Sequence, residues 1–81
     1  MSLRLKIVTP EKIVYDGDIV SVRVPGSLGS FEILENHAPI ISALDPGTVE
    51  YTAKAGDRTE LQISGGFVEV KKNEVSLCVE L

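Results

Sequence analysis

The sequence predicts an all-β fold, a small two-sheet antiparallel β-sandwich of about eight to ten short strands. Apolar and polar residues alternate over most of the chain, which is typical of strands with one buried face. Glycine or proline recurs at short intervals up to Gly66, so no earlier segment holds a helix of ordinary length, about 11 residues. The residues after Gly66 alternate as well. At 81 residues, we expect a single domain over residues 1–81.

The first part of the chain is expected to form three strands. Residues 3–7 alternate between apolar and basic side chains, and residues 12–15 form a second short strand. Asp16-Gly17 then predicts a tight hairpin, because this dipeptide readily takes the positive φ angles of such turns. Residues 19–24 are expected to return from that turn.

The middle of the chain contains two short apolar runs, residues 31–34 and 40–44, with a polar corner between them at residues 36–39. The alternation breaks at this corner, which carries His37, the only histidine in the sequence. Such a break is expected where a chain leaves one sheet and enters the other. The corner is therefore the first candidate for a functional surface.

The rest of the chain is expected to form two hairpins. Residues 48–53 and 59–63 alternate on either side of a turn, and residues 67–70 and 75–79 repeat the arrangement. Between the hairpins, Gly65-Gly66 indicates a bulge or a close approach between two backbones.

Composition argues against several classes of function. The net charge is −4, with 8 basic and 12 acidic residues, whereas a nucleic-acid-binding surface needs clustered lysine and arginine. No apolar run approaches the roughly 20 residues that span a bilayer, and Met1 to Arg4 leads into a strand with no signal or transit segment. The single cysteine, Cys78, favours an intracellular protein without disulfides. We expect no nucleic acid partner and no direct membrane insertion.

His37 is the obvious candidate for chemistry, because Glu35, Ser42 and Asp45 lie close to it in sequence. The sequence nevertheless lacks a second histidine, a cysteine near His37 and a Gly-x-Ser-x-Gly elbow. We therefore predict no catalytic residue, no metal site and no cofactor, and interpret His37 as a turn or interface residue.

Two other segments invite comparison with known sites. Residues 26–30 are rich in glycine and serine, but they lack the lysine and the following helix of a phosphate-binding loop. Lys71-Lys72 at an expected hairpin tip resembles the modified lysine of lipoyl and biotinyl carrier domains, although neither flanking pattern of those carriers is present. A carrier domain therefore remains an alternative, beside a solvated turn.

Five short motifs are more specific as a set than any of these fragments. They are Val-Tyr-Asp-Gly at 14–17, Val-Arg-Val-Pro-Gly at 22–26, His-Ala-Pro at 37–39, Leu-Asp-Pro-Gly at 44–47 and Gly-Gly-Phe-Val-Glu-Val at 65–70. Along its whole length, the chain resembles the amino-terminal β-sandwich of the epsilon subunit of F-type ATP synthases.

The chain departs from that family's pattern at three points. At residues 29–34 the family usually has Gly-Glu-Phe-Gly-Ile-Leu, or Leu for the Phe, so its acidic residue is replaced by Ser30 and another acid appears at Glu32. Residues 35–36 are Glu-Asn, where the family often has Pro-Gly. The sequence also stops at Leu81, before the two-helix hairpin that binds ATP and inhibits the enzyme in most bacterial members. The resemblance therefore does not imply those two activities here.

The resemblance implies a non-catalytic rotor subunit of a proton-translocating ATP synthase, peripheral to the cytoplasmic face of a bacterial plasma membrane. Its implied partners are the gamma subunit and the c-subunit ring, and indirectly the alpha and beta head where catalysis occurs. A free-standing β-sandwich that binds other proteins remains an alternative.

The resemblance also suggests which residues meet these partners. The c-ring contact is expected at one end of the sandwich, at Ser30, Phe31, Glu32 and His37. The gamma contact is expected at an exposed apolar patch on one sheet, formed by Ile40, Ile41, Val68 and Val70.

Overall fold

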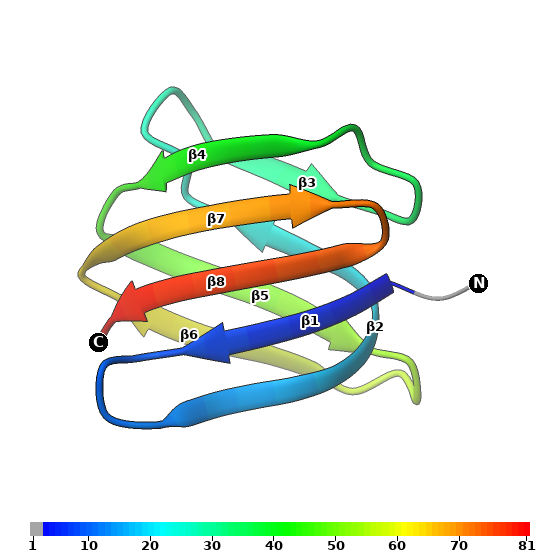
Figure 1. Ribbon diagram of the computed structural model, residues 1–81. Helices are drawn as coiled ribbons and strands as arrows, with labels where there is room; N and C mark the ends of the chain where they lie inside the picture. Colours follow the sequence, from blue (N-terminus) through cyan, green and yellow to red (C-terminus); the bar gives the residue numbers. More distant parts are fainter. Residues whose placement is uncertain (1–2) are drawn as a thin grey trace.

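The computed structural model describes residues 3–81, and every regular element in that range is a β-strand (Figure 1). The eight strands are β1 (Leu3–Val8), β2 (Ile13–Val24), β3 (Phe31–Ile33), β4 (Ile40–Leu44), β5 (Gly47–Ala53), β6 (Arg58–Ile63), β7 (Gly65–Lys71) and β8 (Glu74–Glu80). The all-β class expected from the alternation is confirmed. This part of the chain contains no helix long and apolar enough to cross a membrane.

Hydrogen bonds join the strands into one sheet in the order β4-β7-β8-β1-β2-β5-β6, with β3 paired to β2. The sheet folds over on itself into two layers (Figure 1). The front layer contains β4, β7, β8 and β1, the back layer contains β3, β5 and β6, and β2 belongs to both. The expected two-layer arrangement is confirmed. Its paired strands are antiparallel except for β1 and β8, which run parallel.

The long strand β2 joins the two layers because it bends where its pairing partner changes. Residues 13–19 pair with β1 in the front layer, and residues 19–23 pair with β5 in the back layer. The register shifts between Ile19 and Ser21, which leaves Val20 unpaired with β5 and exposed. A bulge of this kind bends a strand and increases its local twist. One short irregularity therefore turns the sheet back over itself.

The tight hairpin expected at Asp16-Gly17 is wrong, because β2 passes through both residues without turning. Asp16 pairs with Lys6 of β1, and Gly17 pairs with Leu5. The Arg4 guanidinium also reaches Asp16, with 2.7 Å between Nη2 and Oδ1. Asp-Gly permits a tight turn but does not impose one, and here the ladder with β1 and a cross-strand ion pair favour the extended backbone.

The turn between β1 and β2 lies instead at residues 9–12. The Thr9 N–H donates to the Lys12 carbonyl oxygen at 2.9 Å. The Thr9 hydroxyl oxygen accepts the N–H groups of Glu11 and Lys12, both at 3.2 Å. Threonine can close a turn in this way because its side chain substitutes for a backbone acceptor.

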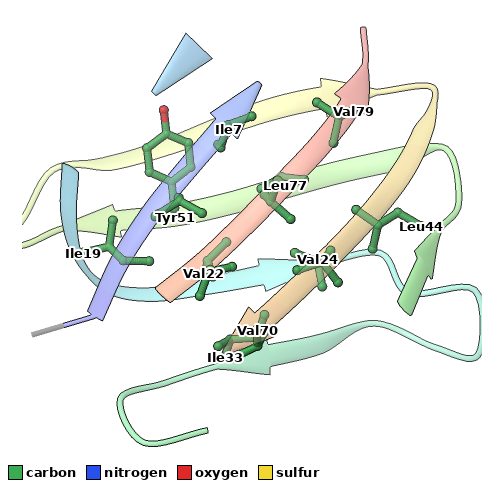
Figure 2. Close-up of a cluster of buried hydrophobic side chains, with 14 of the residues drawn as sticks. Ile7, Ile19, Val22, Val24, Ile33, Leu44, Tyr51, Val70, Leu77 and Val79 are labelled. Carbon is green, nitrogen blue, oxygen red and sulfur yellow. The ribbon is translucent and has the colours of Figure 1, made fainter. Parts of the chain in front are cut away.

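The core lies between the two layers, and among residues 3–81 it contains no buried polar or charged side chain. In Figure 2, Ile7, Leu77, Val79 and Val70 of the front layer face Tyr51 and Ile33 of the back layer and the side chains of β2. The core residues are Leu3, Leu5, Ile7, Ile19, Val22, Val24, Ile33, Leu44, Val49, Tyr51, Ile63, Val68, Val70, Val75, Leu77 and Val79.

Gly66 confirms the expected close approach between backbones. Its φ angle is +146°, and a Cβ added there would overlap the carbonyl oxygen of Cys78 and lie 2.8 Å from the Cα of Val79. Both groups belong to the backbone of β8, the partner of β7, so neither can move aside without breaking the ladder. Only glycine fits this position.

Replacing Gly66 with alanine is therefore expected to lower the free energy of unfolding by about 2 kcal/mol or more. The matched control is Gly56→Ala, because Gly56 also has a positive φ of +104° but no atom within 4 Å of its added Cβ. The control should lose less stability, since it bears backbone strain alone. Urea denaturation of both variants measures the difference, and equal losses would show that the contact with β8 carries no cost.

Candidate functional site

The polar corner crosses from the back layer to the front layer, as the broken alternation predicted. It connects β3, which pairs with β2, to β4, which pairs with β7. The His37 N–H donates to the Leu34 carbonyl oxygen at 3.2 Å, and Asn36 has a left-handed φ of +66°. Asparagine tolerates this conformation better than most residues, which explains how the chain turns here without glycine.

Phe31 and His37 lie together at this corner. Their ring centroids are 6.3 Å apart, and the ring planes are inclined by 30°. The half-buried His37 ring places Nδ1 2.8 Å from the Ala38 carbonyl oxygen. Because a carbonyl can only accept, Nδ1 carries the proton and donates to it. The imidazole is thereby oriented by its own loop and packed beside an aromatic ring.

The corner does not assemble a set of metal ligands from the residues that the structure describes. No group of three or more histidine, cysteine, aspartate or glutamate side chains in residues 3–81 is placed to hold a metal ion. The same residues leave no buried side-chain nitrogen or oxygen without a hydrogen-bond partner. What the corner offers is a fixed shape of aromatic and polar groups, suited to contact with another molecule.

Glu32 is separated from the Phe31 and His37 pair, although the three were expected to share one contact. Neighbouring residues of a strand point to opposite faces, and Glu32 is exposed on the outer face of the back layer. There its Oε1 lies 3.9 Å from Nη2 of Arg23 on β2. Ser30, just before β3, is exposed.

Glu32 belongs to a polar hollow on the outer face of the back layer. The hollow has a volume of about 190 Å³ and is lined by Ser21, Arg23, Glu32, Glu50, Thr52 and Arg58. Arg58 Nη2 lies 2.6 Å from Glu50 Oε1, and this hydrogen bond together with the glutamate charge raises the pKa of the Arg58 guanidinium. In this hollow Arg58 pairs with Glu50, and Arg23 lies within ion-pair distance of Glu32.

Two residues expected at an exposed apolar patch are instead in the core. Val68 is 0% exposed and Val70 is 2% exposed, so neither can contribute to a surface. The prediction chose the wrong face of β7, whose outward side chains include Phe67. Of the two residues expected on β4, Ile41 is 73% exposed, whereas Ile40 is half-buried and packs against the core.

A row of exposed and half-buried apolar residues crosses the outer face of the front layer. Neighbouring strands pair Ala43 with Phe67, Phe67 with Cys78, Cys78 with Val8, and Val8 with Ile13. We call these five residues the apolar row. Phe67 is 49% exposed and Ile13 is 58% exposed. The sequence could not reveal this row, because its members are brought together only by the register of five strands.

An apolar groove runs beside this row. It has a volume of about 400 Å³ and is lined by Val8, Thr9, Pro10, Gly66, Phe67, Cys78, Val79 and Glu80. The groove contains the outward faces of Phe67 and Cys78 and the turn that follows β1. The apolar row is therefore a shaped surface, with relief into which a partner side chain could fit.

The other end of the same face is charged. Lys71 pairs with Glu74, Glu74 with Arg4, and Arg4 with Asp18 across four strands. Arg4 also bonds Asp16 at 2.7 Å, and its Nη1 lies 3.9 Å from Asp18 Oδ1. The outer face of the front layer thus divides into an apolar end and an end of alternating charge.

Comparison with known proteins identifies the fold and the family. Residues 2–81 match the family model described as ATP synthase, Delta/Epsilon chain, beta-sandwich domain. The ATP synthase epsilon chain of Leptospira interrogans is 42% identical over 79 residues, covering 96% of this chain and 61% of the relative. The Chlorobium limicola ATP synthase epsilon chain is 39% identical, with 98% of this chain and 90% of that relative aligned.

Among solved structures, a chain of the Euglena gracilis mitochondrial ATP synthase superposes with a TM-score of 0.90 at 20% identity, covering 96% of this chain and 50% of that one. At this identity the likeness concerns the fold, and it agrees with the β-sandwich described above. The chain spans about three fifths of the length of the Leptospira relative. On the family model and the identities to the curated relatives, the chain belongs to the ATP synthase delta/epsilon β-sandwich family.

Proposed function

We propose that the chain is a non-catalytic central-stalk subunit of a rotary, proton-translocating ATP synthase, in which it joins the gamma subunit to the c-subunit ring. Family membership supports this role, as do relatives named ATP synthase epsilon chain. The Euglena neighbour belongs to an assembly of OSCP, F1 and c-ring. In this role the chain forms and breaks no covalent bond, and it transmits torque between proton flow and the catalytic head.

The observation that carries the proposal is the apolar row on an otherwise well-packed sandwich. Large contiguous apolar patches are rare on monomeric soluble proteins, and they mark contacts with other proteins. Phe67 is the centre of this surface, because it is a half-exposed aromatic residue beside the apolar groove. Aromatic residues are enriched at the centres of interfaces. We assign this face to the gamma subunit, with Ile41 at its margin.

The second surface is the edge formed by the polar corner and the start of β3. Ser30 is exposed there, and Phe31 and His37 form a pair oriented by the surrounding loop. Leu34, which follows β3 and precedes the corner, is also exposed. We assign this edge to the c ring. Glu32 lies on the neighbouring face, where its Oε1 is 3.9 Å from Nη2 of Arg23 on the paired strand β2.

A stalk subunit with these two contacts lies outside the bilayer, held against the ring on the cytoplasmic face of a bacterial plasma membrane. The bacterial relatives support a place in a membrane-associated ATP synthase. The sandwich suits this position, because a close-packed apolar core between two hydrogen-bonded layers deforms little under load.

Replacing Phe67 with glutamate tests the gamma contact. A carboxylate buried without a partner at an interface is costly, so the dissociation constant for the gamma subunit should rise about tenfold or more. Gln62→Glu, on an exposed position of β6, is the matched control and should leave binding unchanged. Calorimetric titration with purified gamma subunit measures both. Equal affinities for the two variants would exclude the apolar row from the interface.

Replacing His37 with alanine tests the ring contact. The side chain is half-buried and makes one hydrogen bond within its loop, so the free energy of unfolding should fall by only about 1 kcal/mol. In membrane vesicles that contain the assembled enzyme, the ratio of proton pumping to ATP hydrolysis should decrease. A large loss of thermal stability with an unchanged ratio would show that His37 serves the fold and not the ring.

A further inference from the structure

The polar corner is held from outside its own loop, by the hairpin tip between β7 and β8. The backbone N–H of Asn36 donates to the side-chain oxygen Oδ1 of Asn73 at 2.7 Å. In return, Asn73 Nδ2 lies 3.4 Å from Asn36 Oδ1. The two residues are 37 positions apart in the chain, and Figure 1 shows their loops side by side at one end of the sandwich.

Asn73 is in turn fixed to the front layer. Its carbonyl oxygen accepts the N–H of Arg4 at 2.8 Å, which ties the hairpin tip to the beginning of β1. Lys72, just before it, has a left-handed φ of +58°, so the tip is a tight turn. The side chain of Asn73 therefore extends toward the corner from a hydrogen-bonded turn. Its short hydrogen bond to Asn36 fixes the position of the corner.

The corner depends on this bond for its exact placement. Asn36 is the residue with the left-handed backbone, and His37 follows it directly. A change in the orientation of the Asn36 peptide therefore moves the His37 ring relative to Phe31. The bond is exposed to solvent, so water can replace it without leaving a buried donor unsatisfied. Its loss should displace the corner while leaving the fold intact.

We propose that Asn73 is a positioning residue that fixes the Phe31 and His37 pair for contact with the c ring. Through β7, β8 and β1, it links that edge to the layer that carries the apolar row. The Asn36–Asn73 bond thus adds a second connection, beside the β4 strand that follows the corner, between the ring contact and the gamma contact. This inference rests on the proposed function, because the positioned residues matter only if the corner meets the ring.

The first test uses the purified chain and amide hydrogen exchange followed by NMR. In Asn73→Ala the Asn36 amide should exchange about fivefold faster, because the variant lacks the acceptor. In Asn73→Asp the introduced carboxylate still accepts the N–H, and the Asn36 side chain can turn its amide group to donate as well, so protection should remain. Lys72→Ala, at the adjacent exposed position, is the control and should match the wild type. Unchanged Asn36 exchange in Asn73→Ala would overturn the proposal.

The second test uses the assembled enzyme in membrane vesicles. Asn73→Ala should lower the ratio of proton pumping to ATP hydrolysis, Asn73→Asp should restore it, and gamma-subunit binding should be unchanged in both variants. Rescue by Asn73→Asp is the decisive result. If residue 73 had a merely structural role, the pumping ratio would not depend on whether its side chain carries an acceptor oxygen.

Two results would contradict the positioning role, and they differ in what else they reject. If His37→Ala lowers the pumping ratio but Asn73→Ala does not, the corner meets the ring without needing Asn73, and the proposed function stands. If neither variant changes the ratio although Asn36 exchange has increased, the ring contact itself is absent, and the proposed function fails with it.

Discussion

The fold depends on one strand that belongs to both layers. β2 pairs with β1 along its first half and with β3 and β5 along its second half, and the change of partner occurs at the bulge around Val20. Without this bend the strands would form an open sheet with one face of valine, leucine and isoleucine left in water. Because β2 is continuous, the two layers are joined by an unbroken backbone as well as by the packing between them. Each surface of the sandwich is therefore connected to the other through a single hydrogen-bonded network.

This architecture explains how a small protein can present two distinct surfaces. The core takes up the inward side chains of both layers and contains no buried polar or charged residue among residues 3–81. The outward positions are thus free to differ: an apolar row on the front layer, paired charges on the back layer, and a structured corner at the edge between them. None of these surfaces requires the core to change. A family built on such a sandwich can vary its contacts residue by residue while it keeps the same fold.

The alternation and its break predicted the strands other than β2, which was divided in two, together with the two hairpins of the second half and the crossing at residues 36–39. The alternation failed where the backbone conformation, or the choice of the buried face, depended on residues distant in sequence. Asp16-Gly17 has the local chemistry of a turn, but its conformation is set by pairing with Lys6 and Leu5. Val68 and Phe67 lie on opposite faces of β7, and both are apolar, so the pattern could not say which face is buried. The apolar row and the Asn36–Asn73 bond likewise follow from register and long-range packing.

The parallel pairing of β1 with β8 places the first and last strands of residues 3–81 side by side in the middle of the front layer. During synthesis, β1 and β2 emerge long before the strand that completes their layer. Until residues 74–80 leave the ribosome, one edge of β1 and the gap beside β7 remain open, and each could capture a strand from another chain. In the nascent chain these edges are therefore exposed to association until β8 has been made. The front layer is complete only when β8 has been made.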